Sequence, residues 1–143
     1  MKAVQENIHD NNILSYIIDL KNRFITINTE YDNKEIITII FRNIMGHCFH
    51  DEYENINNYI FEIEENTIEE FINSIGNENF TKYIIENKIQ LYGSTVYVDN
   101  LNNVRNWLKE NKQKCYWIKA SVGISGWILA EEMQIIVENK KIK

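Results

Sequence analysis

Histidine, cysteine and acidic side chains gather in one short segment, His47-Cys48-Phe49-His50-Asp51-Glu52. Imidazole, thiolate and carboxylate are the ligand types that zinc prefers. In an extended segment, however, successive side chains point to opposite faces, so Cys48 and His50 share one face and His47 lies on the other. Only one further histidine and one further cysteine occur in the chain. We therefore expect a strand that leads into a loop, with His47, Cys48 and His50 as the candidate ligands if a metal site forms.

Nucleophilic catalysis meets the same geometric obstacle. Cys48 follows His47 directly, and neighbouring residues of a strand face opposite ways and cannot share a proton. Cys115 could meet His47 or His50 only through the fold, and a place in the core is the simpler interpretation of both thiols. The sequence contains no glycine-rich phosphate loop and no serine elbow. We expect no enzymatic activity and no cofactor.

Carboxylates dominate the interval between Arg42 and Lys82, which contains no basic residue. The candidate binding residues in it are Asp51, Glu52, Glu54, Glu62, Glu64, Glu69 and Glu70. A charge run of this kind is usually a solvated face that keeps an apolar protein in solution. It can also be a docking surface for a basic partner, because complementary charge accelerates association and suppresses wrong partners. Alternation places Glu62 and Glu64 on the strand face opposite Ile63, which favours the docking interpretation.

The overall charge and composition exclude several classes of protein. A formal net charge of −6 opposes sequence-independent binding to nucleic acid. No apolar run approaches the roughly 20 residues of a membrane helix, and no export segment opens the chain. Two cysteines without a pairing pattern are typical of reduced thiols in the cytosol. We expect one cytoplasmic domain over residues 1–143, with residues 1–12 loosely held and residues 139–143 as a basic tail.

Apolar alternation predicts strands before the acidic interval. Ile13–Leu20 and Arg23–Glu30 form an expected hairpin across Lys21-Asn22. Glu35–Asn43 is expected to be a central strand covered on both sides, since its apolar residues occupy both faces. A short strand at His47–His50 follows, with a bulge or bend at Gly46. Short connections between consecutive strands indicate an antiparallel meander.

Helical signals begin after the strand predicted at Tyr59–Glu64. Thr67 and Glu70 have the spacing of a capping box, and Gly76 suits the left-handed position that ends the helix. Further helices are expected over residues 79–87 and from a cap at residue 99 or 100 to Glu110. Final strands are expected over residues 114–120, 127–130 and 134–137. The predicted fold is therefore α+β: an antiparallel β-meander sheet of about five to seven strands with two or three helices packed on one face. The three tryptophans are expected in the core or on a sheet face, where one could anchor an interface.

The order of these motifs resembles small immunity-protein-like families that occur near bacterial polymorphic toxins. The resemblance rests on His9-Asp10-Asn11-Asn12-Ile13-Leu14, on the following hairpin, and on the strand Ile37–Phe41 that ends in Asn43-Ile44. Tyr59–Glu65 and Ser121–Trp127 are also similar to segments of Firmicutes relatives. The resemblance implies a non-enzymatic protein that binds a cognate toxin and blocks its active site or substrate surface. If that toxin is a basic nuclease, a surface of carboxylates could mimic the phosphates of its nucleic-acid substrate.

Two other functions stay open from the sequence. The first is a small-ligand or nucleotide-sequestering protein of the phage or anti-defence type, with basic pockets formed by Lys112, Lys114, Lys119 or the tail Lys140–Lys143. The second is a metal-dependent enzyme that uses the cluster from His47 to Glu52. The sequence does not determine the partner or the oligomeric state.

Overall fold

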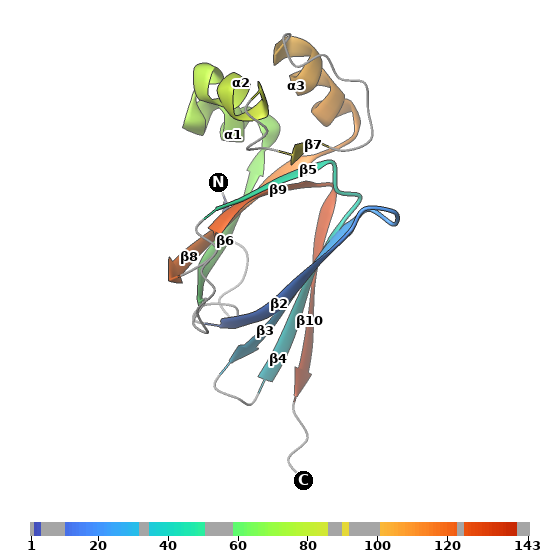
Figure 1. The fold of residues 1–143 in the computed structure, drawn as a ribbon, viewed down its shortest axis with the longest axis vertical. Coiled ribbons are helices and arrows are strands. Elements are labelled where there is room, and N and C mark those ends of the chain that lie inside the picture. The colour runs from blue at the N-terminus through green and yellow to red at the C-terminus, as the bar shows by residue number, and fades with distance from the viewer. Residues whose placement is uncertain are drawn as a thin grey trace.

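The chain forms an α+β fold with two antiparallel sheets and a layer of helices, which are arranged in space as first sheet, second sheet and helices (Figure 1). The computed structural model describes residues 2–3, 11–31, 35–50, 59–85, 90–91, 101–122 and 125–139. The predicted class is therefore confirmed. The described residues form more strands than expected, because they build two sheets, whereas the sequence suggested a single sheet.

The first sheet contains four strands of eight residues each. They are β2 (Asn12–Asp19), β3 (Phe24–Tyr31), β4 (Glu35–Arg42) and β10 (Glu132–Asn139). β2, β3 and β4 follow one another as the predicted meander, and β10 returns from the end of the chain to pair with β4, so the order is β10-β4-β3-β2. Asp19 accepts hydrogen bonds from the backbone and side chain of Asn22 in the predicted hairpin turn.

The second sheet has the order β6-β8-β9-β5, with a two-residue strand at each margin. Its strands are β6 (Tyr59–Thr67), β8 (Lys114–Val122), β9 (Ser125–Ala130) and β5 (Gly46–His50), with β1 (Lys2–Ala3) beside β6 and β7 (Gln90–Leu91) beside β5. The two sheets are joined at a single residue pair, Asn12 with Tyr59. Gly126 lets β9 approach β5 closely, since a Cβ atom there would lie 1.9 Å from the carbonyl oxygen of Cys48.

Three helices gather at one end of the molecule, beside β5 and β9 (Figure 1). They are α1 (Ile68–Ile75), α2 (Asn77–Ile85) and α3 (Leu101–Glu110), as expected between the strand that ends at Thr67 and the last strands. The predicted capping box is present: the backbone N–H of Glu70 donates to the Thr67 hydroxyl and that of Thr67 donates to the Glu70 carboxylate. None of the described helices is both long and apolar enough to cross a lipid bilayer.

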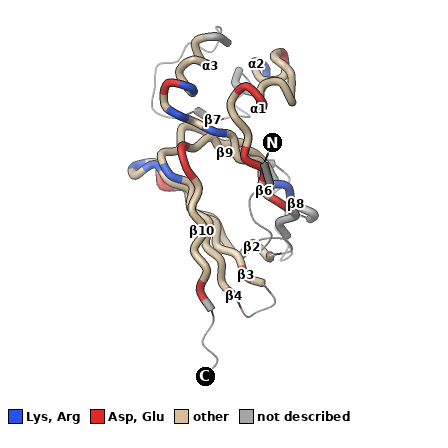
Figure 2. Tube along the Cα trace, turned by 180° about the vertical axis from the view of Figure 1, so that it is seen from behind, with Lys and Arg blue, Asp and Glu red and all other residues tan. Residues whose placement is uncertain are grey.

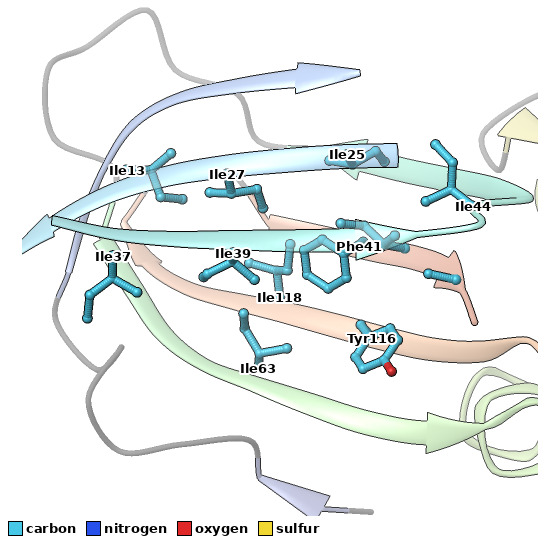
Figure 3. Close-up of a cluster of buried hydrophobic side chains, with 12 residues drawn as sticks. Ile13, Ile25, Ile27, Ile37, Ile39, Phe41, Ile44, Ile63, Tyr116 and Ile118 are labelled. Atoms are coloured by element: carbon cyan, nitrogen blue, oxygen red, sulfur yellow. The ribbon is translucent and has the colours of Figure 1, made fainter. Parts of the chain in front are cut away.

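The core between the two sheets consists mainly of isoleucine. Figure 3 shows Ile25, Ile37 and Phe41 of the first sheet facing the second sheet, which contributes Ile63 and Ile118. The Phe41 and Tyr116 rings meet edge to face with centroids 5.3 Å apart. Burial of each such side chain contributes roughly 1.5–3 kcal/mol of transfer free energy, so this layer is the main source of stability in the first sheet.

The opposite face of the second sheet packs on the helices and is richer in aromatic and sulfur-containing side chains. Phe71 of α1 and Phe80 of α2 meet edge to face with centroids 5.9 Å apart. Both rings belong to one buried cluster with Cys48 of β5 and Cys115 of β8. The second sheet is therefore the middle layer of the molecule, covered by the first sheet on one side and by helices on the other.

Two expectations are corrected by this arrangement. β4 is central in its sheet, but the described residues bury only one of its faces completely: Ile37 and Ile39 are fully buried, whereas Ile36 and Ile40 on the other face are half-buried. Part of the N-terminal segment expected to be loose is held in place, because Lys2–Ala3 pairs with β6 and Asn11 is fully buried. Asn139, the first residue of the expected basic tail, ends β10, and the rest of that tail lies outside the described residues.

Candidate functional site

The predicted metal ligands separate onto two faces of β5. Cys48 lies in the core beneath the helices, whereas the His47 ring contacts Phe49 on the side of the first sheet, with centroids 5.1 Å apart. His50 is the last residue of β5, and its side chain lies outside the described part of the structure. Among the described residues, no three histidine, cysteine or acidic side chains are grouped so that they could hold a metal ion.

Both thiols belong to the core, as expected. Cys48 and Cys115 are buried and reduced. Burial raises the pKa of Cys115 well above its ordinary value, and the nearby Cys48 raises it further. A thiol held in this protonated form is a weak nucleophile, because the thiolate is the reactive species.

The predicted acidic surface divides into three parts. Asp51, Glu52 and Glu54 lie outside the described residues. Glu69 and Glu70 belong to the first turn of α1, where Glu70 closes the capping box. The Glu69 carboxylate lies 2.8 Å from Lys109 Nζ and 3.3 Å from Arg105 Nε, both on α3. The hydrogen bond from Lys109 is the main cause of a lowered pKa at Glu69.

Glu62 and Glu64 point to the same face of β6, as the alternation predicted, and both contact Lys119 of β8. The Lys119 Nζ atom lies 2.5 Å from Glu64 Oε1 and 3.3 Å from Glu62 Oε1. It also lies 4.2 Å from the centroid of the Trp117 ring. We call Glu62, Glu64, Trp117 and Lys119 the Lys119 cluster. Two carboxylates and an indole ring surround one ammonium group, which is how proteins recognise a cationic side chain.

Cross-strand register explains why these side chains meet. Glu64 lies opposite Trp117, Trp117 lies opposite Trp127 of β9, and Trp127 lies opposite Cys48 of β5. This row therefore runs from an acidic side chain at β6 to a buried thiol beneath the helices. The Trp127 ring contacts Phe71 of α1 and stacks on Tyr83 of α2, with centroids 5.5 and 6.1 Å away. The helices cover the inner part of the row, and Glu64 at its acidic end is buried, whereas Glu62 and Lys119 beside it are partly exposed.

The electrostatics of the Lys119 cluster are partly compensated. Partial burial opposes the charge of Lys119, but hydrogen bonds to Glu64 and Glu62 outweigh it and raise the pKa of Lys119 above its ordinary value. Glu64 is buried, and its second oxygen, Oε2, has no hydrogen-bond partner among the described residues. Two carboxylates and one ammonium leave the cluster with a formal charge of −1 at neutral pH. Among the described side chains, one negative charge of the cluster is therefore not balanced by a cation.

Figure 2 shows the same compensation over the described residues as a whole. Acidic segments of β6 and α1 lie beside basic segments of β8 and α3. Lys114, a basic residue that the sequence suggested for a ligand pocket, lies 3.7 Å from Glu65. Glu62, Glu64, Glu65 and Glu69 of the acidic interval are thus paired with cations from β8 and α3.

Sequence reasoning missed the role of Lys119 and Trp117 in this site. The period-two pattern of β8 was sufficient to place both on one strand face. It did not reveal that β8 pairs with β6, a strand about fifty positions earlier, because alternation defines the faces of a strand and not its neighbours. Comparison of the chain with protein-family models, with curated proteins and with solved structures finds no match.

Proposed function

We propose that this protein is a non-enzymatic binding protein of the immunity type, which binds a basic protein partner through the Lys119 cluster. The observation that carries the proposal is the pair of carboxylates around Lys119 Nζ, one of which keeps a buried oxygen without a partner among the described residues. The partner chemistry that fits is an arginine or lysine side chain. A basic toxin, such as a nuclease, carries side chains of this kind, and this protein would block the toxin by binding them.

The binding step is an exchange of ion pairs. An incoming guanidinium donates to Glu62, whose side chain is 31% exposed, while Lys119 keeps its contact with the buried Glu64 and its position over Trp117. Because the carboxylates are already oriented by Lys119, little side-chain entropy is lost on binding. The net charge of −6 adds a long-range attraction for a basic protein, which raises the association rate at low salt.

The test has two stages. The protein is first used to retain partners from a lysate of the source cells at low and high salt, and the retained species are identified by native mass spectrometry. The expected result is a stoichiometric basic protein that is lost at high salt. Its affinity is then measured for the double variant Glu62→Gln/Glu64→Gln and for the control Glu30→Gln/Glu138→Gln, which removes the same charge from the first sheet.

The double variant should weaken binding by about tenfold or more, which corresponds to roughly 1.4 kcal/mol, while the control should keep wild-type affinity. Equal affinities for the two variants would refute the site. A protein that retains no partner but carries a small bound mass would replace the proposal with a ligand-binding function. Stoichiometric zinc in the purified protein would instead direct attention to the segment from His47 to Glu52.

A further inference from the structure

The four sheet margins of the described structure differ in how much free backbone they present. The second sheet ends in β1 and β7, strands of only two residues each. β2 has a register irregularity between Ile13 and Ser15 and continues onto β6 through Asn12. β10 is different: all eight of its residues pair with β4 in one unbroken register, and no described strand lies on its other side (Figure 1).

Proteins usually protect a long sheet edge from pairing with another chain. The devices they use are short strands, proline, bulges and charged side chains, lysine above all. The sequence of β10, Glu-Met-Gln-Ile-Ile-Val-Glu-Asn, has no proline and no lysine, and it carries charge only near its two ends, at Glu132 and Glu138. Its centre is apolar, and Val137 is 47% exposed although it lies opposite the fully buried Ile37. Half of the backbone N–H and C=O groups of an edge strand point away from its sheet, so β10 can accept another strand.

We infer that β10 pairs with β10 of a second copy of this chain, so that two first sheets form one continuous antiparallel sheet across a two-fold axis. The pattern of β10 is compatible with its own copy. Met133, Ile135 and Val137 lie on the face toward the core, and the even-numbered residues lie on the other face. An antiparallel pair keeps the core faces together when each odd residue lies opposite an odd residue.

Of the registers that satisfy this rule, those centred on Ile135 and on Ile136 overlap most, and charge selects between these two. Pairing Ile135 with its own mate would place Glu132 opposite Glu138 twice, and like charges directly opposite destabilise a sheet. Pairing Ile136 with its own mate avoids this contact. It sets Gln134 opposite Glu138 and Ile135 opposite Val137, and Glu132 then lies opposite no carboxylate of the other β10. The exposed Val137 is then covered by an isoleucine of the other copy.

Sedimentation velocity of the full chain over a wide concentration range tests the pairing. The wild type should sediment as a dimer, and Val137→Lys should sediment as a monomer, because it introduces a charge at the centre of the edge. The matched control is Leu14→Lys, which places the same charge at a similarly exposed apolar position of β2, on the opposite margin of the sheet. Circular dichroism checks that both variants keep their secondary structure.

Cysteine cross-linking tests the register independently. Directly opposed Cα atoms of an antiparallel pair are about 4.5–5.5 Å apart, within the range of a disulfide. Ile136→Cys should therefore yield a covalent dimer on mild oxidation. Gln134→Cys should not, because four residues, or about 13 Å, separate Gln134 from its own mate along the strands.

A monomeric wild type would overturn the inference, whether or not the monomer binds a strand of a different protein at this edge. A dimer that persists in Val137→Lys, or one in which Gln134→Cys cross-links as well as Ile136→Cys, would also overturn it. These outcomes do not depend on the partner proposed for the Lys119 cluster, since the edge and the cluster belong to different sheets.

Discussion

Successive residues of β8 point into two different environments. Tyr116 and Ile118 face the first sheet and are almost completely buried among isoleucines. Cys115 and Trp117 face the helices, and Lys119 extends the same face beyond them. One face of the second sheet is therefore buried by the first sheet, whereas the other face is buried only where helices cover it. The difference teaches that the apolar face holds the fold together, whereas the partly covered face accommodates charged side chains such as Lys119.

Removal of a large side chain between the two sheets should have the largest effect on stability. Phe41→Ala is expected to lower the free energy of unfolding by about 3–5 kcal/mol, because Phe41 is fully buried and the cavity cannot collapse between two sheets. Ile40→Ala, on the half-buried outer face of the same strand, should cost no more than about 1 kcal/mol. Urea denaturation measures both. Equal losses would show that the outer face of β4 is also covered.

Removal of the ammonium group from the Lys119 cluster should have a smaller effect. Lys119→Ala leaves the buried Glu64 carboxylate without its cation and should cost about 1–3 kcal/mol. Addition of Glu64→Gln should restore part of this loss, because the uncompensated charge is removed. The matched control is Lys109→Ala, whose ion pair with Glu69 is more exposed and should contribute about 0–1 kcal/mol. If the two lysine variants lose the same stability, the cluster is only a surface ion pair.

The helix cap at the end of β6 tests whether the two faces unfold together. Thr67→Ala removes the capping hydroxyl and should cost about 1 kcal/mol. Hydrogen exchange should accelerate in α1 more than in β3 and β4, since the cap belongs to the helix side of the second sheet. Thr81→Ala, whose hydroxyl donates to Asn77 within α2, serves as a control that leaves the α1 cap intact. Uniform acceleration across both faces would contradict the comparison.

Alkaline pH should weaken the inter-sheet face through the buried phenol of Tyr116. Burial, and then the charge and hydrogen bond of Glu65, raise the pKa of Tyr116 above its ordinary value of 10.0. The unfolded chain therefore loses this proton first, so stability present below pH 10 is lost as the pH rises toward the folded-state pKa. Tyr116→Phe should cost about 1 kcal/mol at neutral pH and flatten the alkaline decline. An unchanged pH profile in this variant would show that other groups, such as Lys119, cause the decline.

Local features of this fold were predictable from the sequence, because each depends on residues close together in the chain. The hairpin of β2 and β3, the capping box at Thr67 and the alignment of Glu62 with Glu64 are all of this kind. The α+β class followed from their sum. The distribution of apolar residues in β4 was misleading, since Ile36 and Ile40 suggested complete burial of both faces, and the described residues bury these two side chains only partly.

Long-range pairing was not predictable, and the candidate site depends on it. Neither the return of β10 to β4 nor the contact of β8 with β6 leaves a local signal, because side-chain alternation is the same for any neighbouring strand. For this reason Glu62 and Glu64 were recognised as candidates, whereas their partner Lys119 was assigned to a different kind of site. The net charge of the cluster became calculable only when the three side chains were placed together.

The most direct test of the proposed function is the affinity of the retained basic partner for Glu62→Gln/Glu64→Gln, measured at low and high salt beside Glu30→Gln/Glu138→Gln. The proposal predicts that the first variant loses about tenfold or more in affinity together with much of the salt dependence, while the second keeps both. Wild-type affinity and salt dependence in the first variant would contradict the claim that the Lys119 cluster binds the partner.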